Sequence, residues 1–215
     1  MKIFIYTRYF FRSVLFRGFL NTLRVLRAEA SYDKKFGIST STIKKSESAE
    51  FYHYQGAGYL ALLTVLREAA ARTASFHFVD IGCGKGRAVF AAEFCGYNQL
   101  RGIELDAELV EIANANLKSY RLKRKGSHIE FIHVNALGHA YANVPTVYFF
   151  FNPFSEAVMQ NVLNRIAQAT QSETWFIYMN PQYKTPFEKI GAESVKTFKT
   201  GKYTETSVFR LNARQ

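Results

Sequence analysis

The sequence Phe78-Val-Asp-Ile-Gly-Cys-Gly-Lys-Gly-Arg87 decides the fold of this chain, because an apolar run ends there in an acid and opens into three alternating glycines. Residues 76–81 are mostly aromatic or branched, as in a strand that is covered on both faces. Apolar residues with helical spacing begin directly after Arg87. The stretch therefore predicts a buried strand, a tight turn and the start of a helix.

The three glycines also predict a place where a ligand lies against the backbone. Glycine lets a ligand approach the main chain closely, and the N–H groups at the start of a helix favour an anionic group. A dinucleotide-binding loop would need its third glycine at position 87, which is Arg87, and a Walker loop would need Ser or Thr where Gly86 stands. The remaining pattern is acid-x-Gly-x-Gly-x-Gly, formed by Asp80, Gly82, Gly84 and Gly86.

Composition limits the size and the setting of the protein. A chain of 215 residues that is 48% hydrophobic can bury the core of one α/β domain and still carry an extension. Its two cysteines, Cys83 and Cys95, provide neither a disulfide framework nor a metal-ligand cluster, so we expect a reducing, cytoplasmic setting. The net charge of +11 predicts an acidic partner, either nucleic acid or an anionic membrane surface.

Residues 1–50 form a basic, aromatic extension ahead of the domain at 51–215. The part from Met1 to Arg27 contains no acid, and its arginines interrupt the apolar residues too often for a bilayer span or a cleaved signal peptide. These arginines do not gather on one face of a helical wheel. We expect one or two helices packed on the domain or on a second subunit of a homodimer. The alternative is an arm that binds a membrane surface or nucleic acid.

A polar segment and an aromatic segment connect the extension to the first helix of the domain. Residues 39–50 are small and polar, which predicts a linker or a loop across the site. The aromatic residues of 51–59 come next, before the helical pattern from Leu60 to Arg72. This aromatic cluster has two interpretations, ordinary packing or a lid over the ligand.

After the glycine turn, strand and helix patterns alternate, as a parallel sheet requires. The strand 100–104 ends in Glu104, close to the twenty-residue offset at which a carboxylate meets ribose hydroxyls. Asp106 is the expected N-cap of a helix over 107–120. A third strand, 129–134, ends at Asn135-Ala136.

The second half of the chain has two strands that end in Asn-Pro. Residues 146–151 lead into Asn152-Pro153-Phe154. In one interpretation this is only a strand that ends in a turn, because proline cannot continue the hydrogen-bond ladder. A helix over 155–170 and a strand over 174–179 follow. The segments 194–200 and 204–211 predict an antiparallel hairpin around Gly201.

These features together resemble the class I S-adenosylmethionine (SAM) methyltransferases over roughly residues 52–211. Five strand–helix units closed by a hairpin match their Rossmann-like α/β fold, a seven-stranded, mostly parallel sheet with an antiparallel C-terminal hairpin. Tyr54-Gln55, the 78–87 stretch, 150–154 and the Tyr-Asp-x-x-x-Gly-Ile sequence at 32–38 look like a group of bacterial class I methyltransferases. The resemblance implies SAM as the cofactor and does not name an acceptor.

The resemblance also implies roles for particular residues. Those expected to bind SAM are Gln55, Asp80, Gly82, Gly84, Gly86, Glu104, Asn135 and Ala136. Asn152-Pro153-Phe154 resembles, with one proline missing, the motif in which amino-group methyltransferases orient a target amine and stack an aromatic ring on a planar substrate. Tyr54 or His53 is the candidate proton acceptor, and no metal is expected.

The predicted function is therefore methyl transfer from SAM by in-line displacement, to an amine nitrogen of an unidentified acceptor. One alternative is an O- or C-methyltransferase for a lipid-like or envelope substrate, with the extension as a docking arm at the inner face of the membrane. A second alternative is a non-catalytic module that binds nucleic acid.

Overall fold

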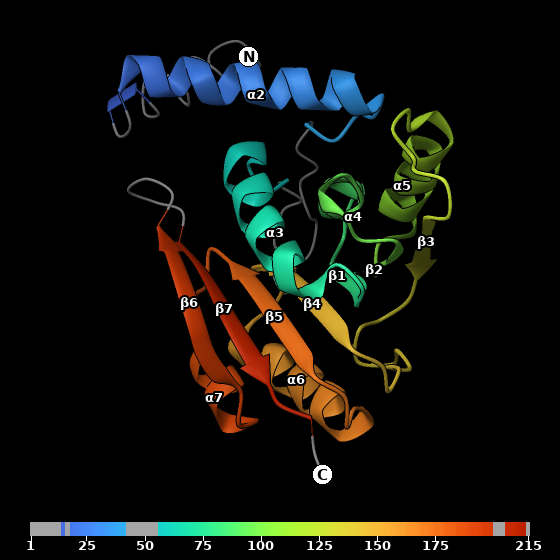
Figure 1. The fold of residues 1–215 in the computed structure, drawn as a ribbon, viewed down its shortest axis with the longest axis vertical. Coiled ribbons are helices and arrows are strands. Elements are labelled where there is room, and N and C mark those ends of the chain that lie inside the picture. The colour runs from blue at the N-terminus through green and yellow to red at the C-terminus, as the bar shows by residue number, and fades with distance from the viewer. Residues whose placement is uncertain (1–13, 16–17, 42–55, 200–204, 214–215) are drawn as a thin grey trace.

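A computed structural model of the chain describes residues 14–15, 18–41, 56–199 and 205–213. A seven-stranded sheet lies between two layers of helices, and the long helix α2 lies outside one layer (Figure 1). The strands are β1 (His77–Ile81), β2 (Gln99–Glu104), β3 (His128–His133), β4 (Thr146–Phe151), β5 (Thr174–Met179), β6 (Glu193–Lys199) and β7 (Glu205–Leu211). The helices are α2 (Phe19–Phe36), α3 (Tyr59–Thr73), α4 (Arg87–Cys95), α5 (Ala107–Ser119), α6 (Glu156–Ala169) and α7 (Thr185–Lys189).

The strand order is β3-β2-β1-β4-β5-β7-β6. Strands β1 to β5 are parallel, and β7 runs antiparallel to both β5 and β6. The predicted Rossmann-like sheet with its antiparallel hairpin is thus confirmed. The chain order reverses between the neighbours β1 and β4, and open α/β sheets bind ligands at such a point, beyond the carboxyl ends of the strands.

Each face of the sheet has its own hydrophobic core, which explains the continuous apolar runs of β1, β4 and β5. Phe78 and Phe149 pack with the residues of α3 and α4 on one face. Tyr148 and Phe150, their neighbours along the strands, pack with α6 and Phe187 of α7 on the other. Alternate side chains of the same strand therefore belong to different cores.

The expected alternation of strand and helix fails at one crossover. Residues 134–145 join β3 to β4, and this fully described segment contains no helix. The prediction of five strand–helix units is therefore wrong at this place. The adjacent hollow near the amino ends of β1, β2 and β3 is lined by polar side chains such as His77, Arg101 and Glu130 together with apolar ones.

Helix α2 packs on the domain, as one interpretation of the extension expected. Phe36 at its end is fully buried and contacts the rings of Tyr59, Phe94 and Tyr120. Gly37 ends the helix in the left-handed conformation, with φ of 75°. Within the described part of the chain, we find no helix that is both long and apolar enough to cross a membrane.

Candidate functional site

The glycine-rich loop, residues 82–86, joins the end of β1 to the start of α4 at the point where strand order reverses. Its glycines have φ values of 78° at Gly82, 52° at Gly84 and 85° at Gly86, a region that other residues rarely adopt. The N–H groups of Gly82 and Cys83 donate to the carbonyl of Ile103 at 2.9 and 3.0 Å. The neighbouring strand β2 therefore holds the loop in place.

Two of the glycines also serve close packing within the protein. A Cβ atom at Gly82 would lie 2.9 Å from Cβ of Pro153, and one at Gly86 would lie 2.5 Å from the ring of Phe131. Real Cβ atoms do not approach other atoms so closely, so both positions exclude any side chain. The contact between Gly82 and Pro153 also brings the segment after β4 against the glycine loop.

Glu104 ends β2 with its carboxylate directed at the glycine loop. One oxygen, Oε2, accepts from the N–H of Gly84 at 2.9 Å. The other, Oε1, accepts from the N–H groups of Leu105 and Asp106 at 2.7 and 3.0 Å. A carboxylate has about four acceptor positions, so these bonds leave room for a further donor such as a hydroxyl.

Asp80 is buried at the end of β1, close to Glu104. Burial raises the pKa of the Asp80 carboxyl well above its usual range, and the charge of Glu104 raises it further. The site thus holds one carboxyl whose pKa is raised by burial beside one that braces the loop.

Asn135 and Ala136 follow β3 on the same edge of the sheet. The side-chain oxygen of Asn135 accepts from the N–H of Leu137 at 2.9 Å and so caps its own turn. One of the two lone pairs of this oxygen remains for another donor. Ala136 is buried, and its carbonyl accepts from the Tyr141 hydroxyl at 2.8 Å.

The Asn152-Pro153-Phe154 segment begins directly beyond the end of β4. Asn152 has a positive φ of 47°, and its Oδ1 lies 3.5 Å from the hydroxyl of Tyr178. Pro153 contacts the glycine loop as described above, whereas Phe154 is partly buried and packs against the core on the α6 face. The structure thus brings Pro153 to the loop, places the Asn152 side chain beside Tyr178 and packs Phe154 against the core.

Asn180, at the corresponding position after β5, has a φ of 52° and so the same unusual conformation as Asn152. Asparagine is one of the few residues that tolerate this region. The predicted residues His53, Tyr54 and Gln55 lie outside the described residues.

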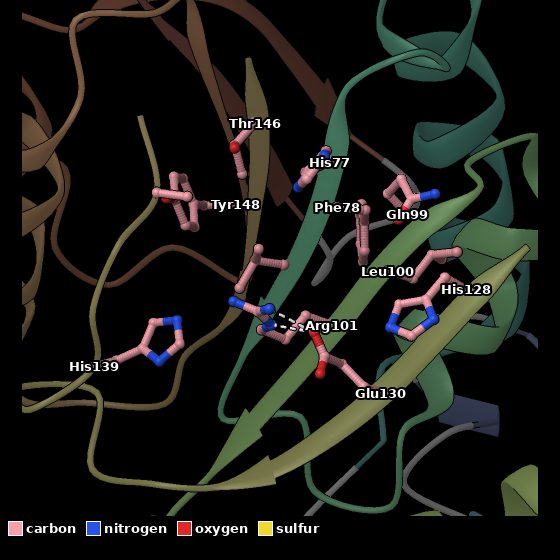
Figure 2. Close-up of a pocket in the computed structure, with 12 residues that line it drawn as sticks. His77, Phe78, Gln99, Leu100, Arg101, His128, Glu130, His139, Thr146 and Tyr148 are labelled. Carbon is pink, nitrogen blue, oxygen red and sulfur yellow. Dashed lines mark hydrogen bonds and ion pairs between the residues drawn. The ribbon is translucent and has the colours of Figure 1, made fainter. Parts of the chain in front are cut away.

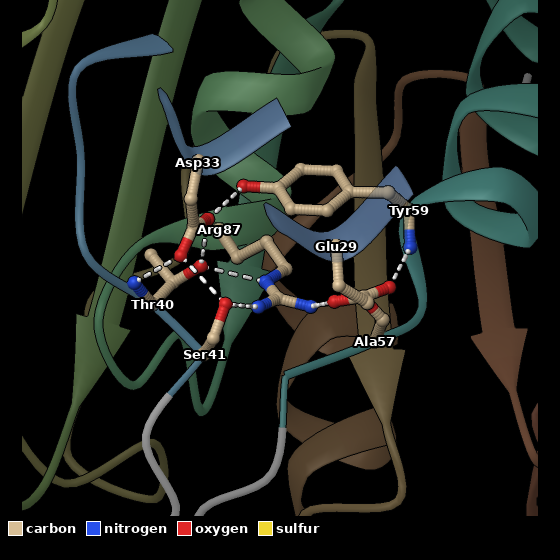
Figure 3. Close-up of polar contacts among 7 residues, drawn as sticks. All are labelled: Glu29, Asp33, Thr40, Ser41, Ala57, Tyr59 and Arg87. Atoms are coloured by element: carbon tan, nitrogen blue, oxygen red, sulfur yellow. Dashed lines mark hydrogen bonds and ion pairs between the residues drawn. The ribbon is translucent and has the colours of Figure 1, made fainter. Parts of the chain in front are cut away.

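A polar network around Arg87 was not predicted from the sequence (Figure 3). Arg87 is the first residue of α4, and only 4% of it is exposed. Its Nη1 donates to Glu29 Oε2 at 2.5 Å and to the carbonyl of Ala57 at 3.0 Å. Its Nε and Nη2 donate to the hydroxyls of Thr40 and Ser41 at 2.7 and 3.2 Å. One side chain thus binds three segments that precede the glycine loop.

The acids of α2 complete this network. Glu29 Oε1 accepts from the N–H of Tyr59, the first residue of α3, at 2.9 Å. The carboxylate of Asp33 accepts from the hydroxyls of Tyr59, Thr40 and Ser41 at 2.6 to 2.7 Å. Burial would raise the pKa of Asp33, but these bonds together hold it below its usual value. The guanidinium of Arg87 also lies 4.4 Å from the centre of the Tyr59 ring.

A hollow of about 260 Å³ opens at the amino ends of β1 to β4, the opposite edge of the sheet (Figure 2). Its lining includes an ion pair between Arg101 and Glu130 at 2.5 Å and the imidazoles of His77, His128 and His139. Burial and the charge of Arg101 lower the pKa of His139. No cluster of three or more His, Cys, Asp or Glu in the described residues could hold a metal ion.

Comparison with known proteins gives structural relatives only. No protein-family model matches the chain, and no curated protein matches its sequence. The N-methyltransferase NodS from Bradyrhizobium japonicum WM9 superimposes with a TM-score of 0.56 and 13% identity, over 72% of this chain and 96% of that chain. The ribosomal protein L11 methylase from Lactobacillus delbrueckii subsp. bulgaricus gives a TM-score of 0.53 and 12% identity, over 73% and 79%.

A third relative, magnesium protoporphyrin IX methyltransferase from Synechocystis PCC 6803, was solved with bound SAM. It gives a TM-score of 0.55 and 12% identity, over 71% of this chain and 77% of that chain. The fold is that of the class I SAM-dependent methyltransferases. In this methyltransferase fold, the glycine loop, Glu104 and Asn152 lie together at the edge where open α/β sheets bind ligands.

Proposed function

We propose that this protein is a SAM-dependent methyltransferase. The observation that carries the proposal is the glycine loop at the reversal of strand order, held at Gly84 by the strand-end carboxylate of Glu104. The three methyltransferases named above share the fold, and one of them was solved with SAM.

The residues of this edge suit the chemical groups of SAM. Glu104 keeps capacity to accept from a ribose hydroxyl, and Asn135 with the Ala136 main chain would face the adenine. The positive-φ glycines allow a ligand to lie against the loop backbone. When bound, SAM supplies a methyl group on an already activated sulfonium, so the protein has to align the acceptor and exclude water. Such alignment lowers the activation free energy by roughly 7–11 kcal/mol when the two reacting groups are well oriented.

We further propose that the acceptor atom is an amine nitrogen. Pro153 contacts the loop at Gly82 and Asn152 precedes it in the chain, and the Asn152 amide oxygen and the Pro153 carbonyl would accept hydrogen bonds from a neutral amine and orient its lone pair. O- or C-methyl transfer to a lipid-like substrate is the second candidate. It is favoured by the exposed leucines and arginines of α2.

Turnover with methyl-labelled SAM and a panel of amines tests the amine assignment. We expect Asn152→Ala to lower turnover at least roughly 100-fold while S-adenosylhomocysteine (SAH) binding persists, as for an interaction needed mainly in the transition state. Asn152→Asp should keep most of the turnover, since it retains an acceptor oxygen.

Asn180→Ala is the matched control, because it places alanine at the same positive φ after the neighbouring strand. Equal turnover losses in Asn152→Ala and Asn180→Ala would show that backbone strain is the cause and would remove the amine-orienting role. Labelling of hydroxyl or carbon acceptors but of no amine would favour the second candidate. Failure of the wild-type protein to bind SAH would overturn the methyltransferase proposal itself.

A further inference from the structure

Helix α2 has an inward stripe and two outward stripes of different chemistry. The inward stripe recurs at intervals of three or four residues and holds the helix on the domain; it consists of Thr22, Val25, Glu29, Tyr32 and Phe36. Glu29 and Asp33, the two acids of the helix, take part in the Arg87 network. Neither acid is exposed on the outward side of α2.

The first outward stripe is basic. Arg24, Arg27 and Lys34 are exposed and follow one another along the helix with Ser31 between them. Residues three and four apart lie on the same side of a helix, so the three cations form one row. The sequence alone did not show this row, because the arginines of 1–27 taken together do not share a face.

The second outward stripe is apolar and runs beside the first. Leu23, Leu26 and Ala30 continue from Phe19 at the same helical spacing. Leu26 is 50% exposed, and Leu20, at the start of the basic row, is 79% exposed. Of the six large apolar side chains exposed in the described residues, four lie within residues 15–26, whereas Leu105 and Val195 lie elsewhere. Three of these four lie on α2 itself, and Leu15 precedes it.

We propose that the outward face of α2 docks this protein on the surface of an anionic lipid bilayer. Helices that lie in a membrane interface place leucine and phenylalanine beside a row of lysine and arginine, which are the two chemistries of this face. Helix α2 lies on the outside of the molecule, beyond α3 (Figure 1). The proposal does not depend on the proposed methyl transfer.

Charge and apolar character together favour lipid over the other acidic partner, nucleic acid. Phosphates would pair with the basic row but would leave the leucines of the neighbouring row without a partner. An anionic bilayer offers phosphate groups to the cations and acyl chains to the leucines at the same depth. Each cation near such a surface strengthens attachment by roughly fivefold.

Vesicle co-sedimentation of the full-length protein tests the proposal. We expect binding to vesicles that mix phosphatidylglycerol with phosphatidylcholine and little binding to phosphatidylcholine alone. Arg24→Glu with Arg27→Glu should weaken partitioning at least roughly 10-fold. Lys123→Glu with Lys125→Glu makes the same change of net charge at another exposed site and should change partitioning less than about twofold.

A second pair of variants tests the exposed leucines of both rows. Leu20→Ser with Leu26→Ser should weaken partitioning several-fold, whereas Val195→Ser, which alters an exposed side chain on β6, should have no effect. The proposal is overturned if wild-type protein stays in the supernatant with anionic vesicles. It is also overturned if both arginine and lysine reversals weaken binding equally, because general attraction of a basic protein then explains the binding. Tighter binding to an RNA oligomer that survives both leucine substitutions would assign the face to nucleic acid instead.

Discussion

Glu29→Gln is expected to destabilise the protein far more than its place on an outer helix suggests. The substitution removes the charge that faces Arg87, which is 4% exposed, while the Glu29 side chain itself is 23% exposed. Breaking a fully buried ion pair costs about 3–5 kcal/mol, and the partial exposure of Glu29 together with the remaining amide oxygen reduces this cost. We expect about 2–3 kcal/mol, or roughly 4–12 °C in Tm for a chain of this size.

Urea unfolding with Glu29→Gln and Glu130→Gln side by side measures this effect. Glu130 also pairs with an arginine, Arg101, at 2.5 Å, but both side chains are about a third exposed. An exposed pair contributes about 0–1 kcal/mol, so Glu130→Gln should cost much less. Equal losses in the two variants would refute the conclusion that Arg87 is a buried charge that depends on α2.

Two further variants test the loop and its buried acid. Gly86→Ala should cost about 2–5 kcal/mol in urea unfolding, because it combines a positive φ with a contact of 2.5 Å to the Phe131 ring; a loss below about 1 kcal/mol would contradict this packing. Burial raises the pKa of Asp80 above its value in the unfolded chain. The stabilisation linked to this shift is therefore fully present below about pH 4 and is lost as pH rises through the folded pKa. The free energy of unfolding of the wild type should therefore fall with rising pH relative to that of Asp80→Asn, and parallel pH profiles would contradict the raised pKa.

Local sequence signals predicted the strands and the glycine loop well. Apolar runs such as 146–151 and the glycines of 82–86 leave few alternatives for the backbone, and Asp106 caps α5 as expected, accepting from the N–H of Glu108 at 3.0 Å. The offset of Glu104 from the loop predicted its place, but its bond to Gly84 became visible only in the structure. These features depend on residues close in sequence or on one fixed spacing.

Features that depend on distant contacts were missed. Arginine is rarely buried, so the sequence analysis did not predict that Arg87 would be enclosed by residues 46 to 58 positions away. Two features of the sequence could have indicated this network. They are the Tyr-Asp-x-x-x-Gly-Ile sequence at 32–38, which contains Asp33, and the arginine at position 87, where a dinucleotide-binding loop has its third glycine. The contact of Phe154 with the core on the α6 face was also not predicted, because the sequence did not specify where α6 lies relative to the motif; stacking of Phe154 on a substrate stays a prediction.

The central claim is that the carboxyl edge of the sheet binds SAM through the glycine loop and Glu104, and calorimetric titration with SAH tests it most directly. The account predicts micromolar binding of SAH by the wild type. Glu104→Ala should lower the affinity roughly 10- to 100-fold, because it removes the carboxylate that accepts from the N–H of Gly84 and would accept from the ribose. Glu130→Ala, at the opposite edge, should bind as the wild type does. Absence of SAH binding in folded wild-type protein, or equal binding by Glu104→Ala, would contradict the account.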